Sequence, residues 1–162
     1  PAMNKNVIRS QRLGEEYHLI TKWHPALYNN IKRGIVSDPV KGLGDRVTDA
    51  SGYGDINDLL TVSDVLVTDY SSVIFEWALL DKPVVYFIYD IDQYRDGRGL
   101  YFDFEEYVYG RCACDSGSLA EAIKAEEPEL EKRAAFNQKF MSSCDGNSTE
   151  RVIKWVFEGE DQ

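Results

Sequence analysis

The stretch KPVVYFIYD, residues 82–90, constrains the fold more than any other part of the chain. Its apolar residues follow one another almost without interruption, so both faces of an extended strand here are apolar. Such a strand is buried on both sides, which is typical of the interior of a parallel sheet and not of an antiparallel sheet with one wet face. The segment therefore predicts a central strand of a mostly parallel sheet, with helices covering both faces.

Strand and helix signals alternate along the rest of the chain. Apolar and β-branched patterns predict strands over 17–23, 45–51 and 64–70 and near Cys112, with no helix between the first two strands. Capping residues and apolar periodicity predict helices over 55–63 and 71–80 and within 118–143, where Pro128 breaks the pattern. The segment 91–115 is expected to be a long irregular loop. The chain therefore predicts an open, mostly parallel, Rossmann-like α/β fold.

A last helix is expected after the turn CDGNST, residues 144–149. Its apolar residues fall on an amphipathic pattern, so we expect this helix to pack back on the core; they are Val152, Ile153, Trp155, Val156 and Phe157.

Length and charge limit the organisation and the partners of the protein. A chain of 162 residues with 43% hydrophobic content is enough for one core, so residues 1–162 are expected to form a single domain. The 28 acidic and 18 basic residues give a formal charge of −10, which argues against nucleic acid as a partner. An anionic ligand must therefore be held by local groups.

Cysteine usage and hydropathy suggest where the protein works. The three cysteines form no CxxC pair, which fits thiols in a reducing compartment better than a disulfide framework. No run of about 18 apolar residues occurs, and the first residues lack the apolar stretch of a signal peptide. The chain is thus expected to be soluble and cytoplasmic, with no membrane segment of its own.

The polar residues of TDYSS, residues 68–72, interrupt two apolar segments at the expected carboxyl edge of the sheet. Ligands of parallel α/β sheets bind at that edge, where helix N-termini present backbone N–H groups. Ser71 and Ser72 could bind a phosphate there, together with Asp69 at the same turn. The other interpretation is that Asp69 or Ser71 is an ordinary N-cap.

The tetrapeptide KWHP places His24 at the carboxyl end of the first strand, and Pro25 favours an extended conformation for it. A histidine in that position suits acid–base work or a hydrogen bond to phosphate, although a lone histidine is often structural. His18 lies near the start of the same strand, so it is not expected to take part.

Three further groups are candidates for binding an anionic or polyol ligand. Arg95 and Arg98 bring guanidinium groups into an acidic protein, where they either clamp phosphate or pair with nearby aspartates. The segment DGNSTERV offers caps and donors at another helix start: Asn147, Ser148, Thr149 and Arg151. Glu105 and Glu106 suit solvated carboxylates or acceptors for ribose hydroxyls better than a metal site, for which no ligand spacing is present.

Several known motifs are absent from the sequence. No GxGxxG, GxxxxGK[ST] or GxSxG occurs, so a dinucleotide fingerprint, a P-loop and a hydrolase elbow are unsupported. On these grounds alone a non-catalytic nucleotide-binding module, a transferase domain and the donor domain of another nucleotide-sugar enzyme stay open.

Four motifs together resemble the C-terminal part of the CDP-glycerol glycerophosphotransferase family, the teichoic acid primases and polymerases of Gram-positive cell envelopes. They are KWHP, DINDLLTVSDVLVTDYSSVIFEWALLDKPVVYF, YRDGRGLYFDFEE and DGNSTERV, and the likeness as a whole covers about residues 17–157. The family usually continues with PGP where this chain has Tyr109, Gly110 and Arg111, so the loop near Arg111 could differ in shape.

The resemblance implies the donor-binding, C-terminal half of a GT-B enzyme whose N-terminal domain is absent from this chain. It implies transfer of glycerol phosphate from CDP-glycerol, or of the ribitol analogue, to a lipid-linked polyol phosphate bound through the missing domain, with release of CMP. His24 would be the catalytic histidine, and Ser71 and Ser72 would hold the diphosphate. Arg95, Arg98 and Arg151 would offset its charge, a task that a divalent cation could share. The whole enzyme would work at the inner face of the cell membrane as a peripheral protein.

Overall fold

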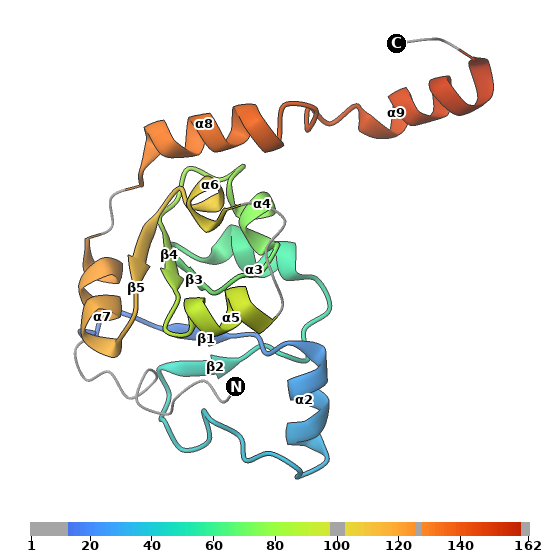
Figure 1. Cartoon of the computed structure of the whole chain (residues 1–162). Coiled ribbons are helices and arrows are strands. Elements are labelled where there is room, and N and C mark those ends of the chain that lie inside the picture. The colour runs from blue at the N-terminus through green and yellow to red at the C-terminus, as the bar shows by residue number, and fades with distance from the viewer. Residues whose placement is uncertain (1–12, 98–102, 126–127, 160–162) are drawn as a thin grey trace.

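The computed structural model describes residues 13–97, 103–125 and 128–159 of the chain. Parallel strands and helices alternate along it, as the predicted α/β class requires (Figure 1). The strands are β1 (Leu19–Thr21), β2 (Val47–Asp49), β3 (Leu66–Thr68), β4 (Val84–Phe87) and β5 (Arg111–Ala113). The helices are α2 (Pro25–Lys32), α3 (Ile56–Val62), α4 (Val73–Trp77), α5 (Ile91–Gly97), α6 (Phe104–Tyr107), α7 (Ser116–Lys124), α8 (Leu130–Phe140) and α9 (Ser148–Ile153), followed by the π-helical turn η1 (Lys154–Glu158).

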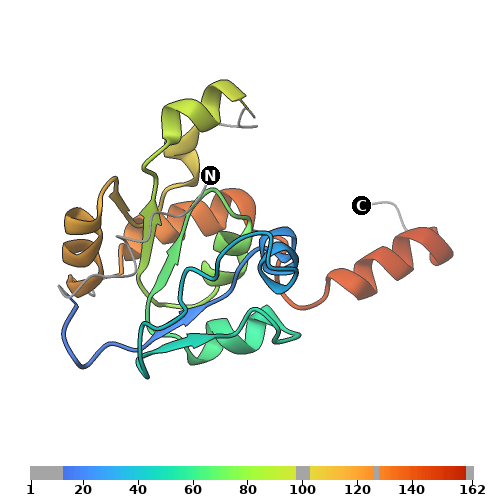
Figure 2. The same cartoon turned by 90° about the horizontal axis from the view of Figure 1, so that it is seen from below.

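The strands form two parallel sheets and not one continuous sheet. In the larger sheet β4 lies between β3 and β5, with Leu66 opposite Val84 and Tyr86 opposite Cys112. Strands β1 and β2 pair with each other and form the second sheet. Both views place β1 on the side of this pair that faces the larger sheet (Figure 1 and Figure 2). The predicted parallel pairing is confirmed, and the division between β1 and β3 is a difference from the single sheet that was expected.

Strand β4 is buried along its whole length, as its composition predicts. Val84 and Tyr86 pack in a cluster with residues of α3, α4, α6 and α8, including Trp77 and Phe136. The alternate residues Val85 and Phe87 pack in a second cluster with Leu119 and Ile123 of α7 and with Ala113 of β5. Because successive side chains of a strand point to opposite faces, this one strand joins both layers of the core.

A buried arginine and a partly buried lysine fix the segment that leads into β4. Arg133 of α8 is only 2% exposed, and its guanidinium donates to the carbonyl oxygens of Leu80, at 2.6 Å, and of Lys82. The ammonium group of Lys82 in turn donates to the carbonyl oxygens of Thr61 and Ser63, at 2.7 Å each, where α3 ends. Such charge-assisted bonds satisfy carbonyls that no helix or strand partner reaches. Helix α8 and the end of α3 are thereby tied to the same short loop.

The segment Tyr109–Arg111, where the chain departs from the pattern of the resembling family, leads into β5. The ring of Tyr109 is buried, and its hydroxyl donates to the carbonyl oxygen of Ile74 at 2.5 Å. A Cβ atom added to Gly110 would collide with the carbonyl oxygen of Val84, so only glycine fits at this position.

Two helical regions differ from the sequence expectations. Helix α2 lies between the first two strands, where no helix was expected: His24 is extended, with ψ of 138°, and Pro25 begins a helix immediately after it. Proline suits the first helical position because its missing N–H has no partner there anyway. The stretch 91–115, expected to be irregular apart from a short strand near Cys112, contains α5 and α6 before β5.

The last helix does not pack on the core, and that expectation is wrong. Helix α9 and η1 extend away from the body in both views (Figure 1 and Figure 2). Their five large apolar side chains are exposed, with Trp155 at 62% and Phe157 at 81%. Gly146, with φ of 84°, lies in the turn that separates α9 from α8. The left-handed conformation of this glycine lets the chain turn away from α8.

Replacing Arg133 by Met is expected to lower the free energy of unfolding by about 3 kcal/mol, because two partly buried carbonyl oxygens lose a charged donor. Urea denaturation measures this change. The matched control is Lys132→Met on the same helix, which removes a surface ion pair with Glu129 and should change stability by less than about 0.5 kcal/mol. Equal losses in both variants would contradict the anchoring role.

Replacing Trp155 or Phe157 by Ser is expected to change the stability of this chain by less than about 0.5 kcal/mol, because neither side chain is buried. By contrast, replacing Trp77, which is 0% exposed, by Ala should lower the free energy of unfolding by about 3–5 kcal/mol. Thermal and urea unfolding of the three variants make the comparison. A large loss at Phe157 would show that the last helix packs on the core in solution.

Candidate functional site

The predicted histidine and the predicted serine pair occupy equivalent places after two parallel strands. His24 lies three residues beyond the end of β1, and Ser71 lies three residues beyond the end of β3. All three side chains are exposed. They belong to different sheets, and none of the hydrogen bonds that these side chains make joins one turn to the other.

His24 is the N-cap of α2. Its Nδ1 accepts a hydrogen bond from the backbone N–H of Ala26 at 3.3 Å, and its carbonyl oxygen accepts from the N–H of Tyr28 at 3.0 Å. A backbone amide only donates, so Nδ1 is an acceptor and the proton of a neutral ring lies on Nε2. The capping bond therefore leaves an N–H donor of the ring for a ligand.

A cavity of about 520 Å³ lies beside this turn. It is lined by Tyr28 of α2 and by residues of β1, β2, α3 and the turn after β2: Ile20, Thr48, Asp49, Ala50, Gly52, Tyr53 and Leu59. Its volume is within the range of small-molecule sites. His24 lies one helical turn before Tyr28 and is not among the lining residues.

The turn between β3 and α4 is consistent with both interpretations of its serines, as helix caps and as groups that bind phosphate. Ser71 Oγ accepts from the backbone N–H of Val73 at 3.4 Å, which is a long capping bond. Ser72 makes no side-chain capping bond. Helix α4 has five residues and is shorter than the predicted helix over 71–80, so its dipole contributes less to anion binding than a full helix would. Hydroxyl and amide donors are therefore the main groups that this turn offers.

Tyr70 was not among the predicted site residues, although it is part of TDYSS. Its ring stacks on Tyr94 of α5 with 4.0 Å between centroids, and its hydroxyl donates to Asp90 Oδ1 at 3.1 Å. Burial, and then the bond to Asp90, raise the pKa of Tyr70, so the phenol stays protonated and remains a donor. Tyr70 thereby fastens α5, which carries Arg95, beside the serine turn.

The remaining candidates in this region differ in their exposure and in their partners. Arg95 follows Tyr94 on the exposed side of α5. Glu106 forms an ion pair with Lys139 of α8, which gives it a structural role. Arg98 and the side chain of Glu105 lie outside the described part of the structure.

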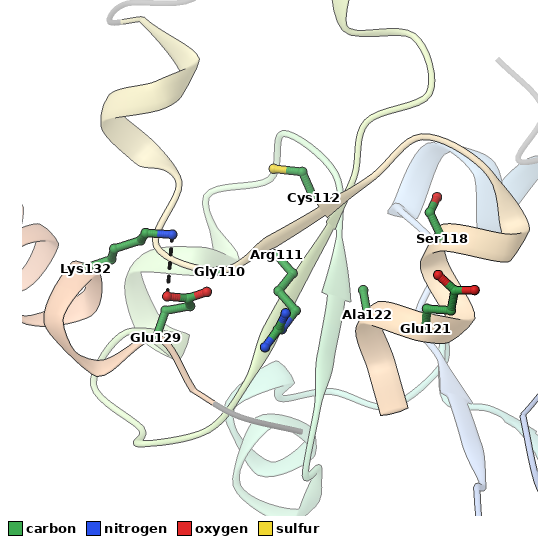
Figure 3. Close-up of a pocket in the computed structure, with 8 residues that line it drawn as sticks. All are labelled: Gly110, Arg111, Cys112, Ser118, Glu121, Ala122, Glu129 and Lys132. Atoms are coloured by element: carbon green, nitrogen blue, oxygen red, sulfur yellow. Dashed lines mark ion pairs between the residues drawn. The ribbon is translucent and has the colours of Figure 1, made fainter. Parts of the chain in front are cut away.

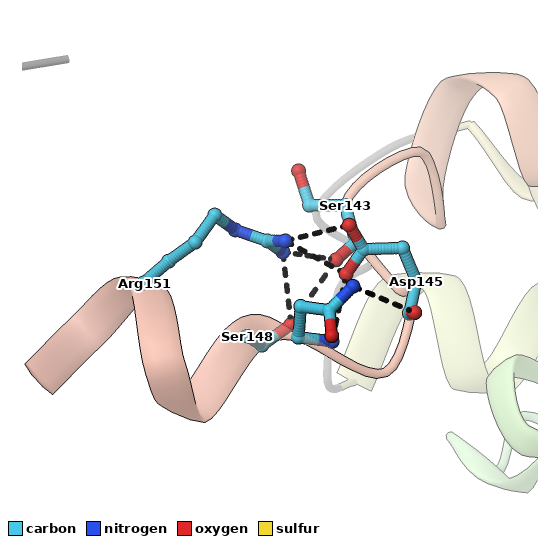
Figure 4. Close-up of polar contacts among 5 residues, drawn as sticks. Ser143, Asp145, Ser148 and Arg151 are labelled. Carbon is cyan, nitrogen blue, oxygen red and sulfur yellow. Dashed lines mark hydrogen bonds and ion pairs between the residues drawn. The ribbon is translucent and has the colours of Figure 1, made fainter. Parts of the chain in front are cut away.

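The polar groups of the segment 143–151 form hydrogen bonds with one another (Figure 4). Arg151 Nη1 donates to both carboxylate oxygens of Asp145 at 2.7 Å, and Nη2 donates to the carbonyl oxygen of Ser143 at 2.6 Å and to Ser148 Oγ at 3.1 Å. The hydrogen bond from Arg151 is the main reason that the pKa of Asp145 falls to about 2. Asn147 precedes α9 and Thr149 lies within it, and no hydrogen bond of Arg151 reaches the serine turn. The structure thus does not bring this group together with Ser71 and Ser72.

A second cavity, of about 450 Å³, lies at the edge strand β5 (Figure 3). It is lined by Gly110, Arg111, Cys112, Ser118, Glu121, Ala122, Glu129 and Lys132. None of the predicted site residues is among them. Lys132 and Glu129 pair across 3.4 Å on its rim, so part of its charge is already compensated.

Metal ligands and membrane spans were sought over the described ranges. Within 13–97, 103–125 and 128–159, no group of three or more histidine, cysteine, aspartate or glutamate side chains is arranged to hold a metal ion. None of the helices in these ranges combines the length and apolar character that crossing a bilayer requires.

Comparison with known proteins gives a consistent result. The family model for CDP-glycerol:poly(glycerophosphate) glycerophosphotransferase matches residues 1–158. The teichoic acid poly(ribitol-phosphate) polymerase of Bacillus spizizenii is 37% identical over 146 residues, which are 90% of this chain and 23% of the relative. The teichoic acid glycerol-phosphate primase of Bacillus subtilis is 36% identical over 145 residues, which are 90% of this chain and 36% of the relative. The chain therefore spans about a third or less of these relatives.

Solved structures agree with the sequence comparison. The wall teichoic acid polymerase TagF superposes with a TM-score of 0.71 at 30% identity, over 91% of this chain and 36% of the TagF chain. A TagF variant soaked with CDPG gives the same TM-score at 29% identity, again over 91% of this chain and 36% of that one.

The pairing of Asp145 with Arg151 predicts a measurable titration. The pKa of Asp145 is lowered from 3.8 to about 2, so the stability that the charged carboxylate contributes is present above pH 3.8 and is lost as the pH falls through about 2. Carbon-13 shifts of the Asp145 carboxyl report its midpoint. Arg151→Met should move the midpoint up toward 3.8, whereas Lys154→Met, which breaks a separate pair with Glu150, should leave it in place. A midpoint near 3.8 in the unmodified chain would contradict the pairing.

Proposed function

The chain belongs to the CDP-glycerol:poly(glycerophosphate) glycerophosphotransferase family, and we propose that it forms the part of such an enzyme that binds the activated CDP-alditol donor. The donor would be CDP-glycerol or CDP-ribitol. The acceptor, a lipid-linked polyol phosphate, would be bound by a second domain of a GT-B enzyme. The observation that carries the proposal is the exposed ring of His24, held after a strand's carboxyl end by a capping bond to Nδ1 that leaves Nε2 for a ligand.

In the proposed reaction, a hydroxyl oxygen at the end of the acceptor attacks the donor phosphorus that bears the polyol. A new P–O bond forms as the diphosphate P–O bond breaks, CMP leaves with the bonding electron pair, and the proton of the attacking hydroxyl passes to the departing phosphate of CMP or to water. Positioning and charge stabilisation supply most of the acceleration in phosphoryl transfer. His24 donates its Nε2 proton in a hydrogen bond to a phosphate oxygen near the reacting centre, where negative charge increases.

The serine turn would hold the diphosphate of the donor. Ser72 has a hydroxyl that makes no capping bond, and the backbone amides that begin α4 lie beside it. Arg95 would approach from α5, because Tyr70 fastens that helix to the same turn. Asp69 lies at the start of the turn and Arg98 just beyond α5, and both remain candidates for donor contacts.

The candidates outside this turn have weaker support. Arg151, Asn147, Ser148 and Thr149 belong to the cluster that Asp145 organises, so they would reach the donor only if another part of the enzyme brings it to α9. Glu105 and Glu106 remain candidates for ribose or acceptor hydroxyls, with Glu106 already paired with Lys139. A divalent cation bound together with the diphosphate is a further option for offsetting its charge.

The proposal includes a place of action. A lipid-linked acceptor restricts the complete enzyme to a membrane surface, and a nucleotide-activated donor is supplied from the cytoplasm. The complete enzyme would thus be a peripheral protein at the inner face of the cell membrane.

The proposal predicts a preference for cytidine nucleotides. CDP-glycerol at about 100 times its Kd should stabilise the chain by about 2.7 kcal/mol in a thermal-shift assay, while UDP- and GDP-sugars should give no comparable shift. In the full-length enzyme, His24→Ala should lower turnover by about 10²- to 10⁴-fold. The control variant is His18→Ala. His18 is the other histidine of the chain, and its Nε2 is hydrogen-bonded to Thr48 on β2. A response to UDP- or GDP-sugars, or full turnover by His24→Ala, would overturn the assignment.

A further inference from the structure

The turns that follow β1 and β2 are joined by three hydrogen bonds. The N–H of Ala50 donates to the carbonyl oxygen of Thr21 at 2.8 Å, which extends the ladder beyond the paired strands. The N–H of Trp23 donates to Ser51 Oγ at 2.9 Å, and Lys22 Nζ donates to the carbonyl oxygen of Tyr53 at 2.7 Å. The residues just before His24 are thus held by the turn after β2 and not by their own helix.

That turn is itself well defined. Ser51 N–H donates to Asp49 Oδ1 at 2.9 Å, and the N–H of Tyr53 donates to the carbonyl oxygen of Ala50 at 2.9 Å. The turn also lies against α2, since a Cβ atom at Gly52 would come within 2.8 Å of the Tyr28 hydroxyl. The Ser51 hydroxyl therefore has a fixed position from which to accept a hydrogen bond.

The bond to Ser51 holds the backbone of Trp23, the residue before His24. The carbonyl oxygen of Ala50 already accepts from Tyr53, and the side chain of Ser51 is the partner of the Trp23 N–H. Trp23 is buried, so its N–H would lose free energy without that partner. This bond holds the Lys22–Trp23 peptide, and His24 follows one residue later with φ of −52° and ψ of 138°. The direction of the His24 ring therefore depends on how the backbone of Trp23 is held.

We propose that Ser51 is a positioning residue for His24: its hydroxyl holds the Lys22–Trp23 peptide, one peptide unit before that of His24, and so helps to set the direction of the Nε2 proton. The importance of this positioning for glycerol phosphate transfer rests on the proposed function, whereas the hydrogen bonds around Ser51 do not depend on it. Asp49 supports Ser51, and Lys22 provides a second link between the same two turns.

The positioning can be measured without any substrate. The chain has only two histidines, so nitrogen-15 labelling of histidine gives one set of ring signals for each. Ser51→Ala should shift or average the His24 ring signals, because the ring loses part of its preference for one tautomer. His18, bonded to Thr48 at 2.8 Å, serves as the internal reference. Ser51→Thr keeps the hydroxyl and should keep the His24 signals. Unchanged His24 signals in folded Ser51→Ala would overturn the proposal.

Two variants separate positioning from general destabilisation. Ser118→Ala removes a hydroxyl that accepts the N–H of Asp115 at 3.3 Å in the capping box of α7, and it should leave the His24 signals unchanged. Should Ser51→Ala fail to fold, Ser51→Cys gives the same test, because a thiol is a weaker acceptor of similar size. A shift of the His24 signals in Ser118→Ala would count against a specific role for Ser51.

Turnover in the full-length enzyme links the positioning to the reaction. Ser51→Ala should lower kcat by about 3- to 10-fold, the equivalent of one hydrogen bond, with KM for the donor changed less, and Ser51→Thr should restore kcat. In the double variant with His24→Ala, the Ser51 substitution should have no further effect on kcat. An equal loss in both backgrounds would contradict action through His24. Failure of the proposed function would instead be recognised by full turnover of His24→Ala, with the ring signals still dependent on Ser51.

Discussion

Burial of β4 on both faces is the constraint on which the rest of the structure depends. Val84 and Tyr86 join the layer of α3, α4, α6 and α8, while Val85 and Phe87 join the layer of α7. A strand that must be covered twice requires helices on two sides and parallel neighbours, because the connecting helices then cross over the sheet faces. The carboxyl ends of β3 and β4 consequently point the same way, and the serine turn and α5 meet there through Tyr70.

Much of this arrangement could be predicted from local sequence. The apolar run of β4, the Asp55 cap of α3 and the short strand near Cys112 are all present, because burial and capping leave strong local signals. Helix α2 was missed because Pro25 was interpreted only through its effect on His24, and not as the first residue of a helix. The position of α9 could not be predicted, since an amphipathic pattern shows that a helix has an apolar face but not what covers it.

The candidate site shows the same limit. Sequence position correctly placed His24 and the serine pair after the ends of strands, where each side-chain bond is to an amide two residues along. The contacts that hold the segments around them come from distant parts of the chain. Tyr70 was not predicted as a site residue, because the polar residues next to it in the sequence explained the motif. Its role depends on Asp90 and Tyr94, which lie twenty or more residues away. Arg151 has the chemistry of a phosphate ligand, yet Asp145, six residues earlier, occupies its guanidinium. Whether Arg151 is available to a ligand thus depends on how the turn before α9 folds.

The separation of α9 from the body has a consequence for how the protein opens. A helix of six residues followed by one π-helical turn is too short to be stable by itself in water, and no buried side chain holds it. Amides of this segment should exchange with deuterium through local opening, independently of the global unfolding that protects β4. Two cooperative units of very different protection are thus expected in one chain, and the less protected one carries the two most exposed aromatic side chains of the described residues, Trp155 and Phe157.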